Sequence, residues 1–198
     1  EARETDDSYD VRLSRSTVVP YLQRIEKMLS GMLVRKPVRL DDVSDLVREQ
    51  LFDVDLEGND LNVWLYQTAR QAISFGHVGV LVDAPKDGDK TRPYWVTYTP
   101  KDILGFRSEV IDGTRQLTQV RLLEQVVEPD GKYGDKIIKQ IRVLERGRYE
   151  IHRKDDKKGE YKLFDEGEMS LKDKIPFAVA YSNRVGFYES RSPLYDIA

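Results

Sequence analysis

The chain has 198 residues, of which 39% are hydrophobic and 34% are charged, and its formal net charge is −3 at pH 7. This near-neutral balance argues against a strongly basic nucleic-acid-binding module, and the lack of cysteine excludes disulfide bonds, thiolate nucleophiles and cysteine-ligated zinc. The longest run without a charged residue, 71–82, is too short for a membrane-spanning helix, which needs about 20 residues.

The two ends of the sequence suggest a piece of a longer protein. There is no initiator Met and no recognisable signal peptide, and the last residue, Ala198, falls within what reads as the start of a helix. Residues 1–15 are rich in charge and lack apolar periodicity, which predicts a charged N-terminal arm. Beyond this arm we expect a helical part over residues 16–76.

A strong helical pattern begins after Ser16 and ends before Pro37, because proline disfavours helical geometry in the preceding residue. Its apolar stripe consists of Val18, Tyr21, Leu22, Ile25, Met28, Leu29, Met32 and Leu33. Burying one such side chain contributes roughly 1.5–3 kcal/mol, so we expect the stripe to face a partner surface.

Two further helices are predicted before residue 77. Asp41, Asp42 or Ser44 could cap a short helix that runs to about Phe52. Asn59 or Asp60 could cap the next, Leu61 to about Phe75, which buries Trp64 and Thr68 and ends at Gly76.

The apolar period then changes from helix-like to strand-like. Strands are expected over 78–82 and 94–98, and turn signals at 112–113, 129–131 and 146–147 separate further strands. We therefore predict an α+β fold, in which N-terminal amphipathic helices precede a mostly antiparallel sheet that curls into a small β-barrel or sandwich over residues 77–185. Residues 186–198 would begin a further segment.

The stretch 76–83 is the most motif-like in the chain. A functional interpretation makes His77 a general base and Asp83 a metal ligand. We favour a structural one, in which Gly76 and Gly79 allow close packing and Asp83 caps the following loop. A general base needs a positioned partner, and the second histidine, His152, lies in a charged hairpin.

An acidic turn precedes the Trp64 helix and superficially matches a calcium loop. Its polar residues are Asp53, Asp55, Glu57, Asn59 and Asp60. An EF-hand loop requires a bidentate Glu at its twelfth position, where this chain has Trp64. We therefore interpret the turn as a cap for the next helix, and we assign no metal, cofactor or catalytic residue in the chain.

Basic and aromatic residues offer weaker signals. Arg184 and Arg191, with Tyr181 and Tyr188, could bind a phosphate or a base edge, although a packing segment is the simpler interpretation. The mixed-sign run 154–158 is typical of a solvated turn. The chain has 11 tyrosines, a residue type that is common at protein interfaces.

The order of several blocks resembles the portal proteins of tailed bacteriophages, in particular a divergent portal-like family. The family more often has Arg where His77 stands, and none of the blocks is a catalytic signature. The blocks are Tyr9-x-x-Arg12-Leu13-x-Arg15-Ser16, Gly31-Met32-Leu33-Val34-Arg35-Lys36-Pro37, Asp53-x-Asp55-Leu56-x-Gly58-x-x-Leu61, Gly76-His77-Val78-Gly79-Val80-Leu81-Val82-Asp83-x-Pro85, Arg92-Pro93-Tyr94, Tyr98-x-Pro100-x-x-Ile103 and Ser192-Pro193-Leu194-Tyr195-Asp196-Ile197-Ala198.

The resemblance implies a structural protein and no enzyme. It implies a dodecameric head-tail connector ring at one capsid vertex, in the virion and, during assembly, in the host cytoplasm. Its partners would be further copies of itself, the terminase large subunit, a head-tail adaptor, capsid and scaffold proteins, and the double-stranded DNA that terminase packages and that later leaves through the channel. The chain would be part of the wing, with the stem to follow. The residues that face the channel or a neighbouring subunit stay unassigned.

Two alternatives stay open. The first is a stand-alone β-barrel module that binds a peptide or single-stranded nucleic acid through Tyr94, Trp95 and Tyr98, which alternate as sheet-face residues do. The second is a hydrolase or nuclease that uses Asp83. It is the least supported, because no second acidic residue lies near Asp83 at motif spacing.

Overall fold

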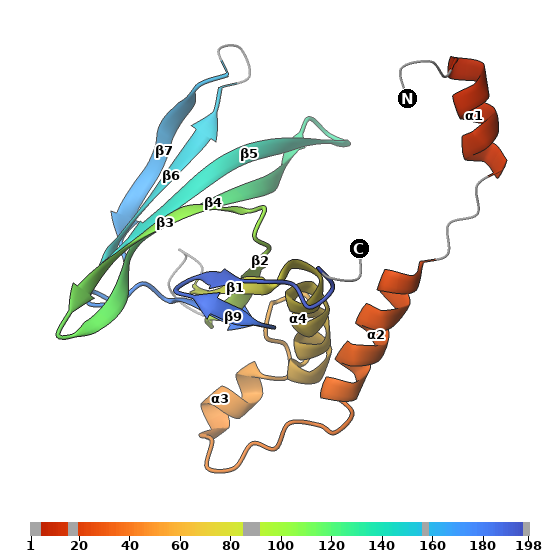
Figure 1. Ribbon diagram of the computed structural model, residues 1–198. Helices are drawn as coiled ribbons and strands as arrows, with labels where there is room; N and C mark the ends of the chain where they lie inside the picture. The colour runs from red at the N-terminus through yellow and green to blue at the C-terminus, as the bar shows by residue number, and fades with distance from the viewer. Residues whose placement is uncertain (1–4, 16–19, 85–91, 156–158, 196–198) are drawn as a thin grey trace.

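Helices form the first part of the chain and antiparallel strands form the second in the computed structural model, which describes residues 5–15, 20–84, 92–155 and 159–195 (Figure 1). This order confirms the α+β class. The helices are α1 (Asp6–Arg15), α2 (Tyr21–Leu33), α3 (Asp45–Gln50) and α4 (Leu61–Phe75).

The helix ends follow local capping chemistry. Ser44 Oγ accepts a hydrogen bond from the Val47 amide at 3.4 Å and caps α3. The Asp60 carboxylate accepts from the amides of Asn62 and Val63 at 2.8 and 2.9 Å and caps α4. Gly76 ends α4 with φ = 93°, a conformation that disfavours residues with a side chain. The predicted caps at Ser44, Asp60 and Gly76 are confirmed.

The expected N-terminal arm is helical over much of its length, because α1 covers Asp6–Arg15. The Thr5 hydroxyl accepts from the Ser8 amide at 3.4 Å near its start. Tyr9 and Val11 are 49% and 48% exposed. A helix that buries so little apolar surface leaves no periodic pattern, which is why the sequence did not predict it.

The strands of the described residues form one three-stranded, one five-stranded and one two-stranded sheet, with orders β2-β1-β8, β3-β4-β5-β6-β7 and β10-β9. All pairs are antiparallel. The strands are β1 (His77–Asp83), β2 (Tyr94–Tyr98), β3 (Ile103–Ile111), β4 (Thr114–Asp130), β5 (Gly134–Glu145), β6 (Arg148–Lys154), β7 (Tyr161–Glu168), β8 (Phe177–Tyr181), β9 (Arg184–Gly186) and β10 (Glu189–Ser190).

The predicted small barrel is wrong. Within the described residues the five-stranded sheet is an open meander whose edge strands, β3 and β7, each pair with a single neighbour (Figure 1). Turns such as Asp112-Gly113, where both φ angles are positive, predict that consecutive strands pair. They say nothing about whether the first and last strands meet, so the hairpin prediction held while the closure prediction failed.

The core lies where the three-stranded sheet meets one end of the five-stranded sheet. Its buried members are Leu81, Tyr98, Val120, Leu122, Leu144, Ile175 and Phe177. Gly79 is required at this contact, because a Cβ atom there would lie 2.2 Å from Cζ of Phe177. A Cβ on Gly76 would lie 2.5 Å from Ser190 Oγ. The interpretation of both glycines as close-packing residues is confirmed.

Candidate functional site

Asp83 belongs to a buried polar network that joins the two larger sheets. Arg142 Nη1 of β5 donates to Asp83 Oδ2 at 2.6 Å, and Arg142 Nε lies 2.8 Å from Glu124 Oε1 of β4. These three side chains are only 12–20% exposed. The Tyr98 hydroxyl donates to Glu124 Oε1 at 2.6 Å, and Gln140 Nε2 donates to Glu124 Oε2 at 2.6 Å. Burial, then the charge of Glu124, raises the pKa of Tyr98 far above its usual value.

This network gives Asp83 a structural role. Its Oδ1 atom accepts from the Ala84 amide at 2.9 Å, so the predicted cap of the following loop is also present. His77 lies at the other end of β1, about 20 Å away at ~3.3 Å per strand residue. Its Nδ1 atom is 3.3 Å from Ser190 Oγ, and partial burial lowers its pKa. The structure therefore does not bring His77 and Asp83 together.

The acidic turn bonds largely to its own backbone. Asp53 Oδ1 accepts from the Gly58 amide at 2.9 Å, and Asp53 Oδ2 accepts from Arg92 Nη2 at 2.7 Å. Asp55 Oδ1 accepts from the Glu57 amide at 3.0 Å. In the described ranges, no three His, Asp or Glu side chains are grouped so that they could hold a metal ion. The cap interpretation is confirmed through Asp60.

The basic and aromatic residues near the C-terminal end do not converge on one point. The Arg184 guanidinium lies over the Tyr181 ring at 5.2 Å, whereas that of Arg191 lies over the Tyr195 ring at 5.3 Å. The Tyr188 amide donates to the Tyr181 hydroxyl at 3.0 Å. Burial raises the pKa of Tyr188 to about 12. These contacts are those of a packing segment. Of the 154–158 run, residues 156–158 lie outside the described part of the chain.

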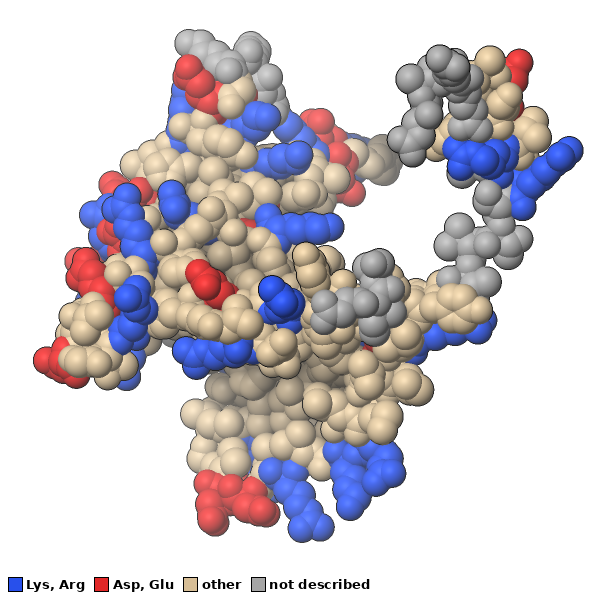
Figure 2. Space-filling view, in the orientation of Figure 1, with Lys and Arg blue, Asp and Glu red and all other residues tan. Residues whose placement is uncertain are grey.

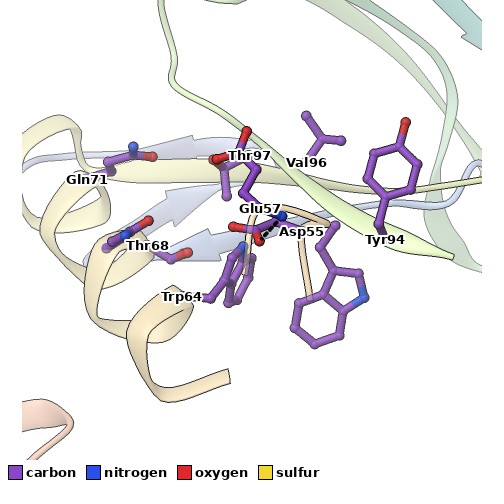
Figure 3. A pocket seen from close by; sticks show the side chains of 10 residues that line it. Asp55, Glu57, Trp64, Thr68, Gln71, Tyr94, Val96 and Thr97 are labelled. Atoms are coloured by element: carbon purple, nitrogen blue, oxygen red, sulfur yellow. Dashed lines mark hydrogen bonds between the residues drawn. The ribbon is translucent and has the colours of Figure 1, made fainter. Parts of the chain in front are cut away.

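A pocket of about 290 Å³ lies between α4, β2 and the acidic turn (Figure 3). The Trp95 amide donates to the Val54 carbonyl at 2.7 Å and thereby fixes the turn against β2. The Trp64 and Trp95 rings meet edge to face, with centroids 4.8 Å apart and planes at 70°. The lining residues are Asp55, Glu57, Trp64, Gln67, Thr68, Gln71, Tyr94, Trp95, Val96 and Thr97.

Two polar atoms in this pocket are buried without hydrogen bonds. Thr68 is 5% exposed, and within the described residues neither its Oγ1 atom nor Gln71 Oε1 has a partner. A buried polar group without a partner costs about 1–3 kcal/mol, so unpaired atoms in two residues that line a pocket mark it as a candidate ligand site. Figure 3 shows both residues on the α4 side, with Thr97 on β2.

Carboxylates stand in the wall that the acidic turn contributes. Among the described residues, no basic side chain forms an ion pair with Asp55 or with the exposed Glu57. Partial burial raises the pKa of Asp55, but hydrogen bonds, first from the Asn59 amide group and then from backbone amides, outweigh it and lower the pKa. Asp55 is therefore an anion at neutral pH.

Sequence reasoning named most of these residues but did not place them together. Trp64 and Thr68 were predicted on the buried face of a helix, and Trp95 was considered an exposed aromatic of a strand. One sequence pattern could have indicated the pocket. Thr68 and Gln71 follow Trp64 at i+4 and i+7, so two polar side chains lie on the same helix face as the tryptophan. Tyr98 is 4% exposed and inside the core, so it is no part of an exposed stacking surface.

The apolar stripe predicted for α2 is only partly covered within the described chain. Ile25 is half-buried, most other members are exposed, and Val18 lies outside the described residues. We define the α2 apolar face as Tyr21, Leu22, Met28, Leu29, Met32 and Leu33, which are 37–70% exposed. The helix packs against α4, where Ser30 is fully buried and Glu26 Oε1 accepts from Arg70 Nε at 2.9 Å. Most of the α2 apolar face is thus exposed among the described residues.

Neither a protein-family model nor a curated protein matches this sequence. No helix in the described ranges is long and apolar enough to cross a membrane.

Proposed function

We propose that this chain is part of a portal protein, the subunit of the head-tail connector ring through which a tailed phage packages and ejects its DNA. The observation that carries the proposal is the open α2 apolar face. Contiguous exposed apolar surface of this kind is typical of protein interaction sites. A ring subunit covers such a surface with its neighbour, because a head-to-tail contact repeated around an axis uses two different faces of each copy.

The charge distribution supports the same role. The chain has 32 basic and 35 acidic residues, and Figure 2 shows both signs interspersed over the visible face. Interspersed charges allow neighbouring subunits to match opposite signs and so set their register. A channel wall with little net charge also suits the passage of DNA. Each DNA phosphate that a protein cation neutralises adds binding affinity through counterion release, and tight binding would slow the movement of DNA through the ring.

In this proposal the two structural parts form the wing of the subunit. Residues 16–76 supply its helical part, residues 77–185 supply its β-rich part as two open sheets, and residues 186–198 lead toward the stem. The partners would be neighbouring subunits, the terminase large subunit, a head-tail adaptor and capsid or scaffold proteins. The role is structural rather than catalytic, and its site is the capsid vertex of the virion.

The test is the assembly state of the full-length gene product. We expect light scattering to give the mass of a ring of about a dozen subunits, and electron micrographs to show rings with a central channel. The 198-residue chain alone should stay near the monomer mass. A full-length product that remains monomeric at high concentration, with and without co-expressed scaffold protein, would overturn the proposal.

A further inference from the structure

We propose that the pocket between α4, β2 and the acidic turn binds the guanidinium group of an arginine side chain presented by another protein chain. The proposal does not depend on the ring assignment, because it rests on the chemistry of the pocket alone. It goes beyond the portal role by naming a binding site and its ligand class.

The pocket offers several acceptors beside the donors of its indole, amide and hydroxyl groups. Gln71 Oε1 accepts only, the Thr68 hydroxyl can accept, and both lack partners among the described residues. Asp55 and Glu57 add carboxylates at the same pocket. A ligand that satisfies this set must carry several donors and a positive charge. Guanidinium has five N–H donors and no acceptor, whereas an ammonium group has three donors.

The aromatic walls favour a planar cation. Trp64 and Trp95 stand edge to face at a centroid distance of 4.8 Å, and Tyr94 also lines the pocket. Tryptophan provides the strongest cation–π contacts of the aromatic residues, and guanidinium stacks on such rings more readily than ammonium does because it is flat and weakly hydrated. The aromatic side chains and the acceptor groups of the pocket therefore both favour a guanidinium group.

An arginine of the chain itself lies close to this region in sequence but is engaged elsewhere. Arg92 Nη2 donates to Asp53 Oδ2 at 2.7 Å, and Arg92 Nη1 donates to the Gln50 carbonyl at 3.4 Å. Arg92 does not line the pocket. No described Lys or Arg therefore pairs with Asp55 or Glu57. The Asp55 carboxylate is held by hydrogen bonds from the Glu57 amide and the Asn59 side chain, whereas Glu57 is exposed at the pocket.

The size of the pocket agrees with a side chain. Its volume of about 290 Å³ is slightly below the range of about 300–1,000 Å³ that is typical of ligand sites for whole small molecules. It would accommodate the end of an arginine together with a few waters, because one water occupies about 30 Å³ of liquid. An extended peptide backbone would remain outside, at the mouth of the pocket.

The two tryptophans of the chain both line the pocket, so intrinsic fluorescence reports directly on its occupancy. The probes are N-acetyl-arginine amide, N-acetyl-lysine amide and N-acetyl-citrulline amide, titrated into the intact chain at constant ionic strength. We expect a saturable fluorescence change with the arginine probe at millimolar concentration, weaker binding of the lysine probe and none of the uncharged citrulline probe. Equal binding of citrulline, or no saturable change with arginine, would overturn the proposal.

Two variants test the assigned groups. Glu57→Gln removes one charge and should weaken binding of the arginine probe about fivefold, as expected for one charge near 4 Å in water. Thr68→Val removes the unpaired hydroxyl with little change of shape and should also weaken binding. Glu109→Gln, an identical change at an exposed residue of β3, is the matched control and should bind as the parent does. Unchanged binding in both pocket variants, with folding verified by circular dichroism, would contradict the assignment.

The source of the guanidinium is tested by comparing free arginine with an acetylated tripeptide that has a central arginine. Free arginine carries an α-ammonium and an α-carboxylate, which the proposal gives no partner. Tighter binding of the tripeptide supports a side chain on a partner protein. Tighter binding of free arginine would show that the pocket accepts a small molecule and would overturn that part of the proposal.

Discussion

Arg142 Nη1 on β5 donates to Asp83 Oδ2 at the end of β1 across 2.6 Å, and so connects two sheets that share no strand. The two residues are 59 positions apart in the chain. Each is 20% exposed, so the pair is largely shielded from solvent. Removing Arg142 would leave the charges of Asp83 and Glu124 partly buried and uncompensated, which costs far more than the loss of a surface pair.

Arg142→Ala is therefore expected to lower the free energy of unfolding by about 3 kcal/mol, measured by urea denaturation. The matched control is Arg148→Ala. That arginine pairs with Glu145 and Glu150, but it is 56% exposed, so its loss should cost less than about 1 kcal/mol. Equal losses in the two variants would show that the Arg142 network does not hold the sheets together.

Gly79→Ala should destabilise the fold, because its new Cβ atom would lie 2.2 Å from the buried ring of Phe177. Overpacking of a core costs typically about 1–3 kcal/mol. Gly31→Ala in α2 is the control, since no atom lies within 4 Å of a Cβ there, and replacing a helical glycine should stabilise by about 0.5–1 kcal/mol. Thermal or urea unfolding of both variants measures the difference, and a neutral Gly79→Ala would contradict the close contact.

Alkaline pH should weaken the fold through its buried tyrosines. Tyrosine ionises near pH 10 when unfolded, whereas burial raises the pKa of folded Tyr188 to about 12. Because the folded pKa lies above the unfolded one, its contribution is complete below pH 10 and is lost as the pH rises toward 12. The loss for Tyr188 should be below the full value of about 1.4 kcal/mol per pH unit, since water still reaches part of the ring.

Tyr188→Phe isolates this effect from that of other groups that titrate in the same range. Urea denaturation of the parent and the variant at pH 9 and pH 11 should show the smaller pH-dependent loss in the variant. Tyr195→Phe, at an exposed tyrosine, is the control and should keep the pH dependence of the parent. Parallel pH profiles for the parent and Tyr188→Phe would refute the expected contribution.

Thr68→Val should raise stability while weakening guanidinium binding. The Oγ1 atom is buried and unpaired among the described residues, so its removal relieves a desolvation cost of about 1 kcal/mol. The same substitution at Thr97, a half-buried residue of the same pocket, is the control for the change in stability. A loss of stability in Thr68→Val, measured by thermal unfolding, would show that the hydroxyl has a partner in the folded chain.

Met32→Lys should impair ring assembly and leave the subunit folded. Met32 is 67% exposed at the α2 apolar face, so a charge there costs little in the monomer but would be buried against a neighbour in the ring. The exposed Gln23 receives the same substitution, Gln23→Lys, as the control. Light scattering on the full-length product should give fewer rings for Met32→Lys only. Normal rings from that variant would place the subunit contact elsewhere.

Local chemistry made part of this structure predictable. Asp60 caps α4 with its own side chain, and Asp112-Gly113 turns the chain with two adjacent residues, so neither depends on distant segments. The apolar stripe of α2 likewise specified a helix. It could not specify a partner, and in the fold Ser30 and Glu26 contribute to the contact with α4 while most of the stripe stays exposed.

Residues within a few positions of one another indicate the α+β order, the hairpin turns and the side chains that could cap the helices. The close-packing role of Gly76 and Gly79 was also predicted, but the atoms that require it belong to Ser190 and Phe177, far away in the chain. The three-dimensional fold was needed to show that the five-stranded sheet stays open, that Asp83 pairs with Arg142, and that Trp64 meets Trp95 in the pocket that Thr68 also lines. Those relationships join segments far apart in the chain. Their formation depends on which apolar faces pack together in three dimensions, and no local pattern of side chains encodes that choice.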